Sequence, residues 1–226
     1  MARGDKRRAE LAAEAVKDRA DSLAPLVELL ASTDELERAR LVRNVLRPRV
    51  ADLTPAMRKK LAEAGIARLS AGDEAWEPAL ALANERDAKA TAEMLREEAA
   101  RLRKGKKARE EERVLRALLK TGLADDEDRY RLASIALRES KLDPRTRRGD
   151  RAIELIEELA RRGYDVGKAL RADRAVELEH LYYVGFCLLE DGLPLGEELL
   201  EEVVKKGGKK KIATAAKNKL KLAERE

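Results

Sequence analysis

Apolar residues recur along most of the chain at the three- and four-residue spacing of an amphipathic helix. Ala152, Ile156 and Leu159 form one such stripe, which Ile153 and Leu155 widen. Short polar stretches separate these segments, so the pattern predicts an all-α protein of about twelve helices. The predicted helices span residues 9–20, 22–31, 34–47, 55–70, 75–85, 87–103, 107–120, 126–140, 149–162, 173–190, 194–206 and 209–223.

Several predicted helices begin at recognisable capping signals. Ser32 and Glu35 have the spacing of a capping box, and Thr54 precedes a proline that fits the first helical position. The acidic run at residues 125–128 has two interpretations, a cation site or a helix start favoured by the helix dipole, and the second is the more common. Residues 163–171 carry weaker signals, and we expect at most one short turn there.

Turn glycines recur along the last two thirds of the chain. Gly72, Gly105, Gly149 and Gly192 are separated by 33, 44 and 43 residues, and each follows an amphipathic helix. Spacings of this size are typical of helix–turn–helix units that stack into an array. The sequence therefore favours a superhelical array of helix pairs, with a compact irregular bundle as the alternative.

One segment carries a fuller repeat pattern. In this segment large apolar residues and glycines are interspersed in a fixed pattern. The residues of the pattern are Leu181, Val184, Gly185, Leu188, Gly192, Gly196, Leu200 and Val203. This pattern resembles a tetratricopeptide repeat, in which small residues let the second helix approach the first. The segment departs from the motif because glycine replaces the usual alanine at 196, the turn has one extra residue and no proline closes the repeat.

A poorer copy of the pattern precedes it, at Tyr130, Ala133, Ser134 and Leu137, with a long insertion around Asp143. The resemblance is best over residues 129–206. It implies a right-handed superhelical array of antiparallel helix pairs.

The sequence also predicts a division of the chain into regions. We expect a basic tail at residues 1–8, a helical-repeat domain at 9–206 and a lysine-rich capping helix at 207–226. Within the repeat domain, residues 9–92 are irregular and residues 93–206 are similar to tetratricopeptide repeats.

Composition supports the helical prediction and locates the charge. Charged residues make up 41% of the chain and aromatic residues only 3%, a composition that favours helices over strands. The formal net charge is +5, of which residues 1–8 contribute +3 and residues 205–226 contribute +7, so the body between them sums to about −5. This distribution favours a scaffold with basic ends. The basic N-terminus lacks the apolar core of a signal peptide and no stretch could insert in a membrane, so we expect a cytoplasmic protein.

Motifs for catalysis and for cofactors are missing from the sequence. His180 is the only histidine, which excludes a multi-histidine metal site and a triad that needs a second one. No phosphate-binding loop or dinucleotide fingerprint occurs. Cys187 stands alone in an apolar run, where a buried thiol is expected. We therefore expect a non-enzymatic protein with no cofactor and no metal.

The repeat resemblance implies a partner-binding surface on the inner, concave face of the array, where this family holds peptides. The positions that it places there are Arg131, Ile135, Arg138, Glu179, Tyr182, Phe186 and Leu189. Two arginines near an apolar strip suit an acidic or carboxylate-ended peptide. In the alternative interpretation, Tyr182 and Phe186 pack against the next helix pair.

A second candidate surface is the lysine-rich C-terminal end. Its residues are Lys205, Lys206, Lys209, Lys210 and Lys211. Lysines of this density bind phosphates in a salt-sensitive and sequence-independent manner, which makes nucleic acid or an anionic surface the alternative partner. No aromatic residue follows Phe186 for bases to stack on, so a solvated capping helix is the competing interpretation.

Overall fold

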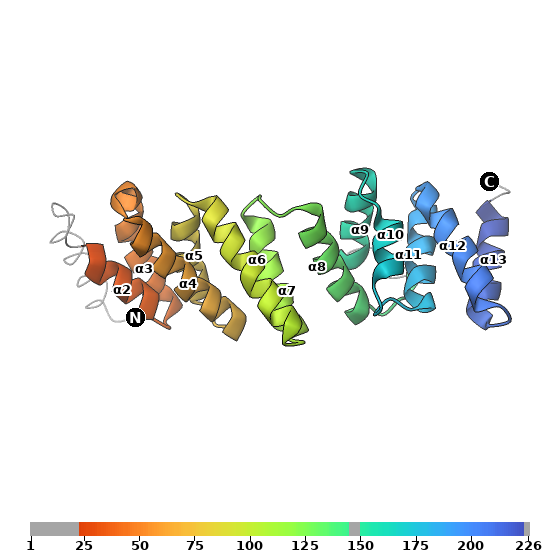
Figure 1. The fold of residues 1–226 in the computed structure, drawn as a ribbon, viewed down its shortest axis with the longest axis horizontal. Helices are drawn as coiled ribbons and strands as arrows, with labels where there is room; N and C mark the ends of the chain where they lie inside the picture. The colour runs from red at the N-terminus through yellow and green to blue at the C-terminus, as the bar shows by residue number, and fades with distance from the viewer. Residues whose placement is uncertain (1–22, 145–149, 224–226) are drawn as a thin grey trace. The chain divides into compact units, whose positions relative to one another are not determined.

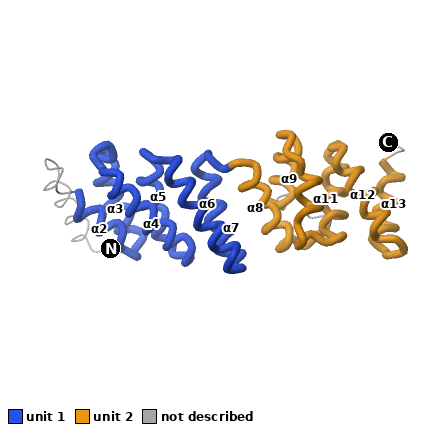
Figure 2. Tube along the Cα trace, viewed as in Figure 1, with its two compact units in different colours: residues 1–124 blue, residues 125–226 orange. Residues whose placement is uncertain are grey.

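The computed structural model describes residues 23–144 and 150–223, and in these ranges the chain is helical without a strand (Figure 1). None of the helices in these ranges has the length and apolar character to cross a membrane. Contacts divide the chain into two compact units, residues 1–124 and residues 125–226 (Figure 2). The boundaries expected from the sequence, after residues 8, 92 and 206, stay predictions.

The first unit is built from consecutive helices that pack in pairs. Its elements are α2 (Leu23–Ser32), α3 (Leu36–Leu46), the 3₁₀ helix η2 (Arg47–Asp52), α4 (Pro55–Ala71), α5 (Trp76–Asn84), α6 (Ala88–Lys104) and α7 (Ala108–Lys120). The most extensive packing joins α4 to α5 and α6 to α7, and α4 also contacts α2 and α7. Leucines such as Leu30, Leu46, Leu61 and Leu82 are fully buried between these helices.

The second unit follows the same plan. Its helices are α8 (Asp126–Glu139), α9 (Arg151–Arg161), α10 (Val166–Ala172), α11 (Leu178–Glu190), α12 (Pro194–Gly207) and α13 (Lys211–Ala223). The most extensive packing joins α8 to α9, α11 to α12 and α12 to α13, while the short α10 contacts α8 and α9. The lone cysteine, Cys187, is buried in α11, as expected.

The predicted helices within the described residues have counterparts in the structure, and the predicted helix at 9–20 lies outside those residues. Two differences occur near residue 170. Residues 166–172 form a helix where at most a turn was expected, and α11 begins at Leu178 instead of residue 173. The side chain of Asp173 accepts a hydrogen bond from the backbone N–H of Ala175, which holds these residues in a turn.

Helix starts follow local side-chain chemistry in two of three predicted places. The Thr54 hydroxyl accepts from the backbone N–H of Met57, so Pro55 opens α4 as predicted. Asp125 and Asp128 form a reciprocal capping box at the start of α8. The capping box predicted at Ser32 is wrong. Ser32 still belongs to α2, and α3 begins only at Leu36 without a side-chain cap.

Glycines allow the helix pairs to cross closely. A Cβ added to Gly65 of α4 would lie 3.0 Å from the Cβ of Leu80 in α5. In the second unit, a Cβ at Gly196 would lie only 2.2 Å from the backbone nitrogen of Leu189. The missing side chains therefore let α4 and α5 approach closely at their middles, and let the start of α12 approach the end of α11.

Candidate partner-binding surface

Three residues of α8 act on a carboxylate that comes from elsewhere in the second unit, one by a hydrogen bond and two by their charge. The Ser134 hydroxyl donates to Oδ2 of Asp173 at 2.5 Å, and Nε of Arg138 donates to the carbonyl oxygen of Ser134 at 3.1 Å. Arg131 and Arg138 both lie close enough to Asp173 for their charges to act on it. We call Arg131, Ser134 and Arg138 the α8 carboxylate site.

The electrostatics of this site favour negative charge. Burial alone would raise the pKa of Asp173. The hydrogen bonds from Ser134 and from the N–H of Ala175, with the positive charges of Arg138 and Arg131, outweigh burial and hold that pKa below its ordinary value. The site therefore stabilises an ionised carboxylate.

Tyr130, the residue before Arg131, brings a buried hydroxyl to the same end of α8. Its side chain is 6% exposed, its ring centroid lies 6.0 Å from that of Tyr164, and its hydroxyl has no hydrogen-bond partner among the described residues. Burial, followed by the nearby charge of Asp173, raises the pKa of this hydroxyl. A buried polar group without a partner is a destabilising feature.

Replacing Tyr130 with phenylalanine is therefore expected to raise the free energy of unfolding by about 1 kcal/mol, because it removes an unsatisfied buried hydroxyl and keeps the ring. Urea denaturation followed by circular dichroism measures the change. Tyr164→Phe is the matched control, since its hydroxyl donates to Glu127 at 2.8 Å and its loss is expected to destabilise the unit. A destabilised Tyr130→Phe variant contradicts the prediction.

The aromatic pair of α11 lies partly under α13. The rings of Tyr182 and Phe186 have centroids 6.1 Å apart, and both side chains are half-buried. The ammonium of Lys219 in α13 lies 4.4 Å from the centre of the Phe186 ring and also forms an ion pair with Glu190. Helix α13 therefore covers part of this aromatic pair and leaves part of it open.

The remaining predicted surface residues differ in exposure. Glu179 is exposed and Leu189 is half-buried. Ile135 is only 2% exposed, because it belongs to the buried face of α8, and this removes it from the surface that a partner can touch. The arginines one turn on either side, Arg131 and Arg138, reach the edge of that face: the first is half-buried and the second is exposed.

The predicted lysines lie at the turn between α12 and α13. Lys205, Lys206, Lys209, Lys210 and Lys211 are all exposed. Nζ of Lys206 donates to Glu202 at 2.6 Å, and the other carboxylate oxygen of Glu202 accepts from Arg171 at 2.6 Å. Burial would raise the pKa of Glu202, but these two cations lower it below its ordinary value. Part of the basic charge is thus neutralised within the fold.

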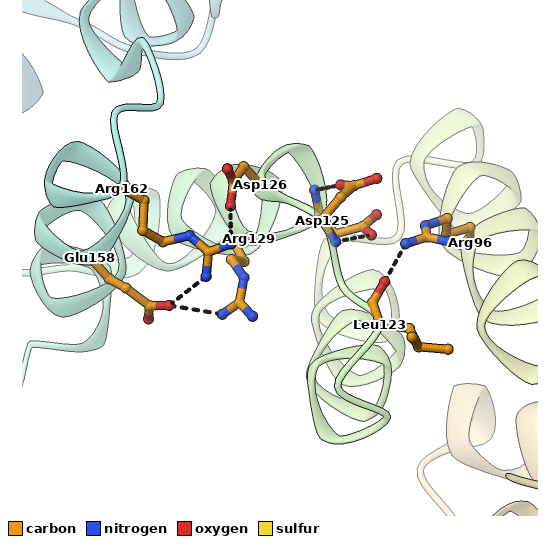
Figure 3. A network of polar contacts seen from close by, with 8 residues as sticks. Arg96, Leu123, Asp125, Asp126, Arg129, Glu158 and Arg162 are labelled. Atoms are coloured by element: carbon orange, nitrogen blue, oxygen red, sulfur yellow. Dashed lines mark hydrogen bonds and ion pairs between the residues drawn. The ribbon is translucent and has the colours of Figure 1, made fainter. Parts of the chain in front are cut away.

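The acids at residues 125–128 cap a helix and form contacts within the second unit. Asp125 and Asp128 cap α8, and Glu127 accepts from the Tyr164 hydroxyl. Asp126 forms an ion pair at 3.0 Å with Arg162, the residue that follows α9 (Figure 3). In the described part of the chain no group of three or more histidine, cysteine or acidic side chains is placed to hold a metal. Two of the four acids therefore cap the start of α8, and the other two bind Arg162 and Tyr164.

The same view shows how charge joins α8 to α9 (Figure 3). Glu158 of α9 accepts from Arg129 at 3.1 Å and lies 3.5 Å from Arg162. In the first unit, Arg96 donates to the carbonyl oxygen of Leu123 at 2.6 Å and holds the end of the α7 segment. These contacts support the fold, and Glu158, like Glu202, lies within reach of two cations.

His180 in the second unit and a cleft in the first unit are weaker candidates for a binding site. Nδ1 of His180 accepts from the backbone N–H of Glu177 at 3.0 Å, so the only histidine closes the first turn of α11. The cleft, of about 400 Å³, is lined by α4, α5 and α6 and mixes cations such as Arg58 with acids such as Glu93 and Glu97. This mixture selects for neither sign of charge.

The sequence pattern identified the two arginines and missed Asp173, the acid on which their charges act. Asp173 and Ser134 belong to no common motif, and they are 39 positions apart in the chain. The available local signal was the Asp-x-Ala turn at 173–175, which the helix predicted at 173–190 obscured.

Comparison of the chain with protein-family models, with curated proteins and with solved structures finds no match.

Proposed function

We propose that this chain is a non-enzymatic, cytoplasmic adaptor that binds an acidic segment of a partner protein through its second unit. The α8 carboxylate site supplies the charge recognition. Tyr182 and Phe186 supply half-buried aromatic surface of the kind that protein interfaces favour. Helical scaffolds serve many functions, so the proposal depends on these side chains rather than on the fold.

The architecture in this proposal is a right-handed superhelical array of antiparallel helix pairs, similar to tetratricopeptide repeats. Its support is the pairwise packing of consecutive helices within each unit and the close glycine crossings at Gly65 and Gly185. In such an array one helix of each pair lines a concave surface, and α8 and α11 would be the lining helices of the second unit.

A single observation carries the functional proposal: the α8 site already holds an ionised carboxylate. Its two arginines lie seven positions apart on one helix, a spacing of two turns that places both on the same side. Guanidinium groups bind carboxylates with charge-assisted hydrogen bonds, which are the stronger class. A glutamate-rich or aspartate-rich segment has the chemistry that this site stabilises.

Neutralising both arginines is expected to weaken binding of an acidic peptide about tenfold, which corresponds to about 1.4 kcal/mol. The probe is an oligo-glutamate peptide with an N-terminal fluorophore, and fluorescence anisotropy measures its affinity for the full chain and for the Arg131→Gln/Arg138→Gln variant. An oligo-glutamine peptide of equal length controls for charge. Circular dichroism confirms that the variant keeps its helix content.

The matched control removes two charges from the lysine-rich end instead. Lys209→Gln/Lys210→Gln has the same change in net charge, and both lysines are exposed. We expect it to bind the peptide as the unmodified chain does. If the lysine variant loses binding and the arginine variant keeps it, the C-terminal end is the anionic-partner surface, and the nucleic-acid alternative becomes the leading function.

A further inference from the structure

The α8 carboxylate site is occupied by a residue of the chain itself. Asp173 lies where α10 ends, five residues before α11 begins. Its Oδ1 accepts from the backbone N–H of Ala175 at 2.9 Å, and its Oδ2 accepts from Ser134. One carboxylate oxygen therefore shapes the turn, and the other points to α8.

We infer that Asp173 is an internal competitor that occupies the α8 carboxylate site and must yield when an acidic segment of a partner binds. This inference rests on the proposed function and adds regulation to it: the chain sets its own affinity through a residue that imitates the partner's carboxylate.

The position of Asp173 suits a competitor better than a sealed structural acid. Its side chain is half-buried, and the neighbouring Arg174 and Arg138 are exposed, so the site opens to solvent on at least one side. The contact from Asp173 to α8 consists of one side-chain hydrogen bond together with the attraction of two arginines. The attraction between charges that water can reach is weak, and another carboxylate can replace the one that Asp173 supplies.

The variant Asp173→Asn separates the charge from the shape of the turn. The asparagine oxygen can accept from the N–H of Ala175 as aspartate does, and asparagine is a common turn residue. The negative charge beside Arg131 and Arg138 is removed. We expect the oligo-glutamate peptide to bind this variant about two- to fivefold more tightly than the unmodified chain, the range of an interaction between solvent-accessible charges.

Asp165→Asn is the control for net charge. Asp165 is exposed and caps α10 by accepting from the N–H of Lys168 at 2.9 Å, a role that asparagine fills equally well. We expect no gain in affinity from this variant. An equal gain from both variants overturns the inference, because overall charge would then explain the effect.

A third variant, Arg131→Gln/Arg138→Gln/Asp173→Asn, closes a mutant cycle. Without the arginines there is nothing to compete for, so removing Asp173 is expected to change the affinity little. A full two- to fivefold gain in this background overturns the inference.

The outcomes separate the inference from the proposed function. If the unmodified chain binds the peptide through its arginines and Asp173→Asn binds no tighter, the inference fails and the proposed function stands. If neither the unmodified chain nor Asp173→Asn binds, both fail. Binding that appears or strengthens only in Asp173→Asn supports both.

Discussion

Gly196→Ala is expected to lower the free energy of unfolding of the second unit by about 2–4 kcal/mol. The added methyl group would lie 2.2 Å from the nitrogen and 2.7 Å from the Cα of Leu189, and 2.8 Å from the carbonyl carbon of Leu188. These are backbone atoms of α11, so no side-chain rotation relieves the clash. The start of α12 must move away from α11, and the core between the two helices loosens.

Two neighbouring glycines provide graded controls. A Cβ at Gly185 would lie 3.1 Å from side-chain carbons of Leu199 and Leu200, a contact that small shifts can relieve. At Gly167 the nearest atoms are the flexible ends of Arg171 and Leu195. We expect the loss of stability to fall in the order Gly196→Ala, Gly185→Ala, Gly167→Ala. The last of these is expected to be near neutral, because alanine favours helix more than glycine does.

The aromatic residues of the chain allow the second unit to be followed separately. All four tyrosines, at positions 130, 164, 182 and 183, lie in this unit, and the sole tryptophan, Trp76, lies in the first. Urea unfolding followed by tyrosine near-ultraviolet signals therefore reports the second unit, and tryptophan fluorescence reports the first. A tyrosine transition of Gly196→Ala at the same urea concentration as the unmodified chain contradicts the prediction.

The same glycine shows what the repeat pattern could and could not predict. The tetratricopeptide-like spacing identifies Gly185 as a close-packing position, and the structure places it against α12. The pattern treats Gly196 as a departure from the usual alanine. Glycine is needed at position 196 because the backbones of α11 and α12 lie so close together there. That distance depends on the whole α11–α12 interface and leaves no signal in the local sequence.

Helices were predictable because their signals are local. Apolar spacing locates the helices, and a run of acids locates a start, as at residues 125–128, where the structure has a capping box. The failure at Ser32 shows the limit of such local signals: the preceding helix α2 continues through the capping residue, and its hydroxyl lies 3.4 Å from the carbonyl oxygen of Leu29. A capping motif cannot operate while its first residue is still helical.

Only the arginines of the candidate site could be predicted from the sequence. The repeat resemblance assigns Arg131 and Arg138 to the partner-binding surface, but it also assigns Ile135 to that surface, and Ile135 is buried. The four-residue spacing from Arg131 to Ile135 covers nearly the same helix face, so a small rotation of α8 decides which of the two is covered. The acid that completes the site, Asp173, required knowledge of a tertiary contact.

Asp150→Ala is the second change expected to have a large effect, a loss of about 2–4 kcal/mol in the free energy of unfolding of the second unit. Oδ1 of Asp150 caps α9 by accepting from the N–H of Ala152 at 2.9 Å. Oδ2 accepts from the hydroxyls of Ser140 and Tyr183, each at 2.6 Å. The variant removes a helix cap and leaves the hydroxyl of the fully buried Tyr183 without this partner.

Asp165→Ala is the matched control, because Asp165 caps α10 and has no comparable bond to a buried hydroxyl. It is expected to lose only the cap, about 1 kcal/mol. Tyrosine-detected urea unfolding measures both variants. Equal losses for Asp150→Ala and Asp165→Ala contradict the prediction, since they leave no contribution from Ser140 and Tyr183.

The charge of Asp150 also makes the stability depend on pH. Burial would raise the pKa of its carboxyl, but the hydrogen bonds from Ser140, Tyr183 and the start of α9 outweigh burial and lower it below its ordinary value. The unfolded chain, with an aspartate pKa of about 3.9, therefore binds this proton more readily than the folded chain. The contribution of Asp150 is fully present at neutral pH and is lost as the pH falls through about 4 toward the lower folded pKa.

Asp150→Asn tests this acid dependence with less change in shape. The variant retains an oxygen to cap α9 and has no charge to lose, so its stability is expected to decline less steeply than that of the unmodified chain between about pH 5 and pH 3. Asp173 also has a lowered pKa and remains in both proteins, so a residual decline is expected in the variant. Parallel curves for the two proteins would show that the bonds to Asp150 do not depend on its ionisation.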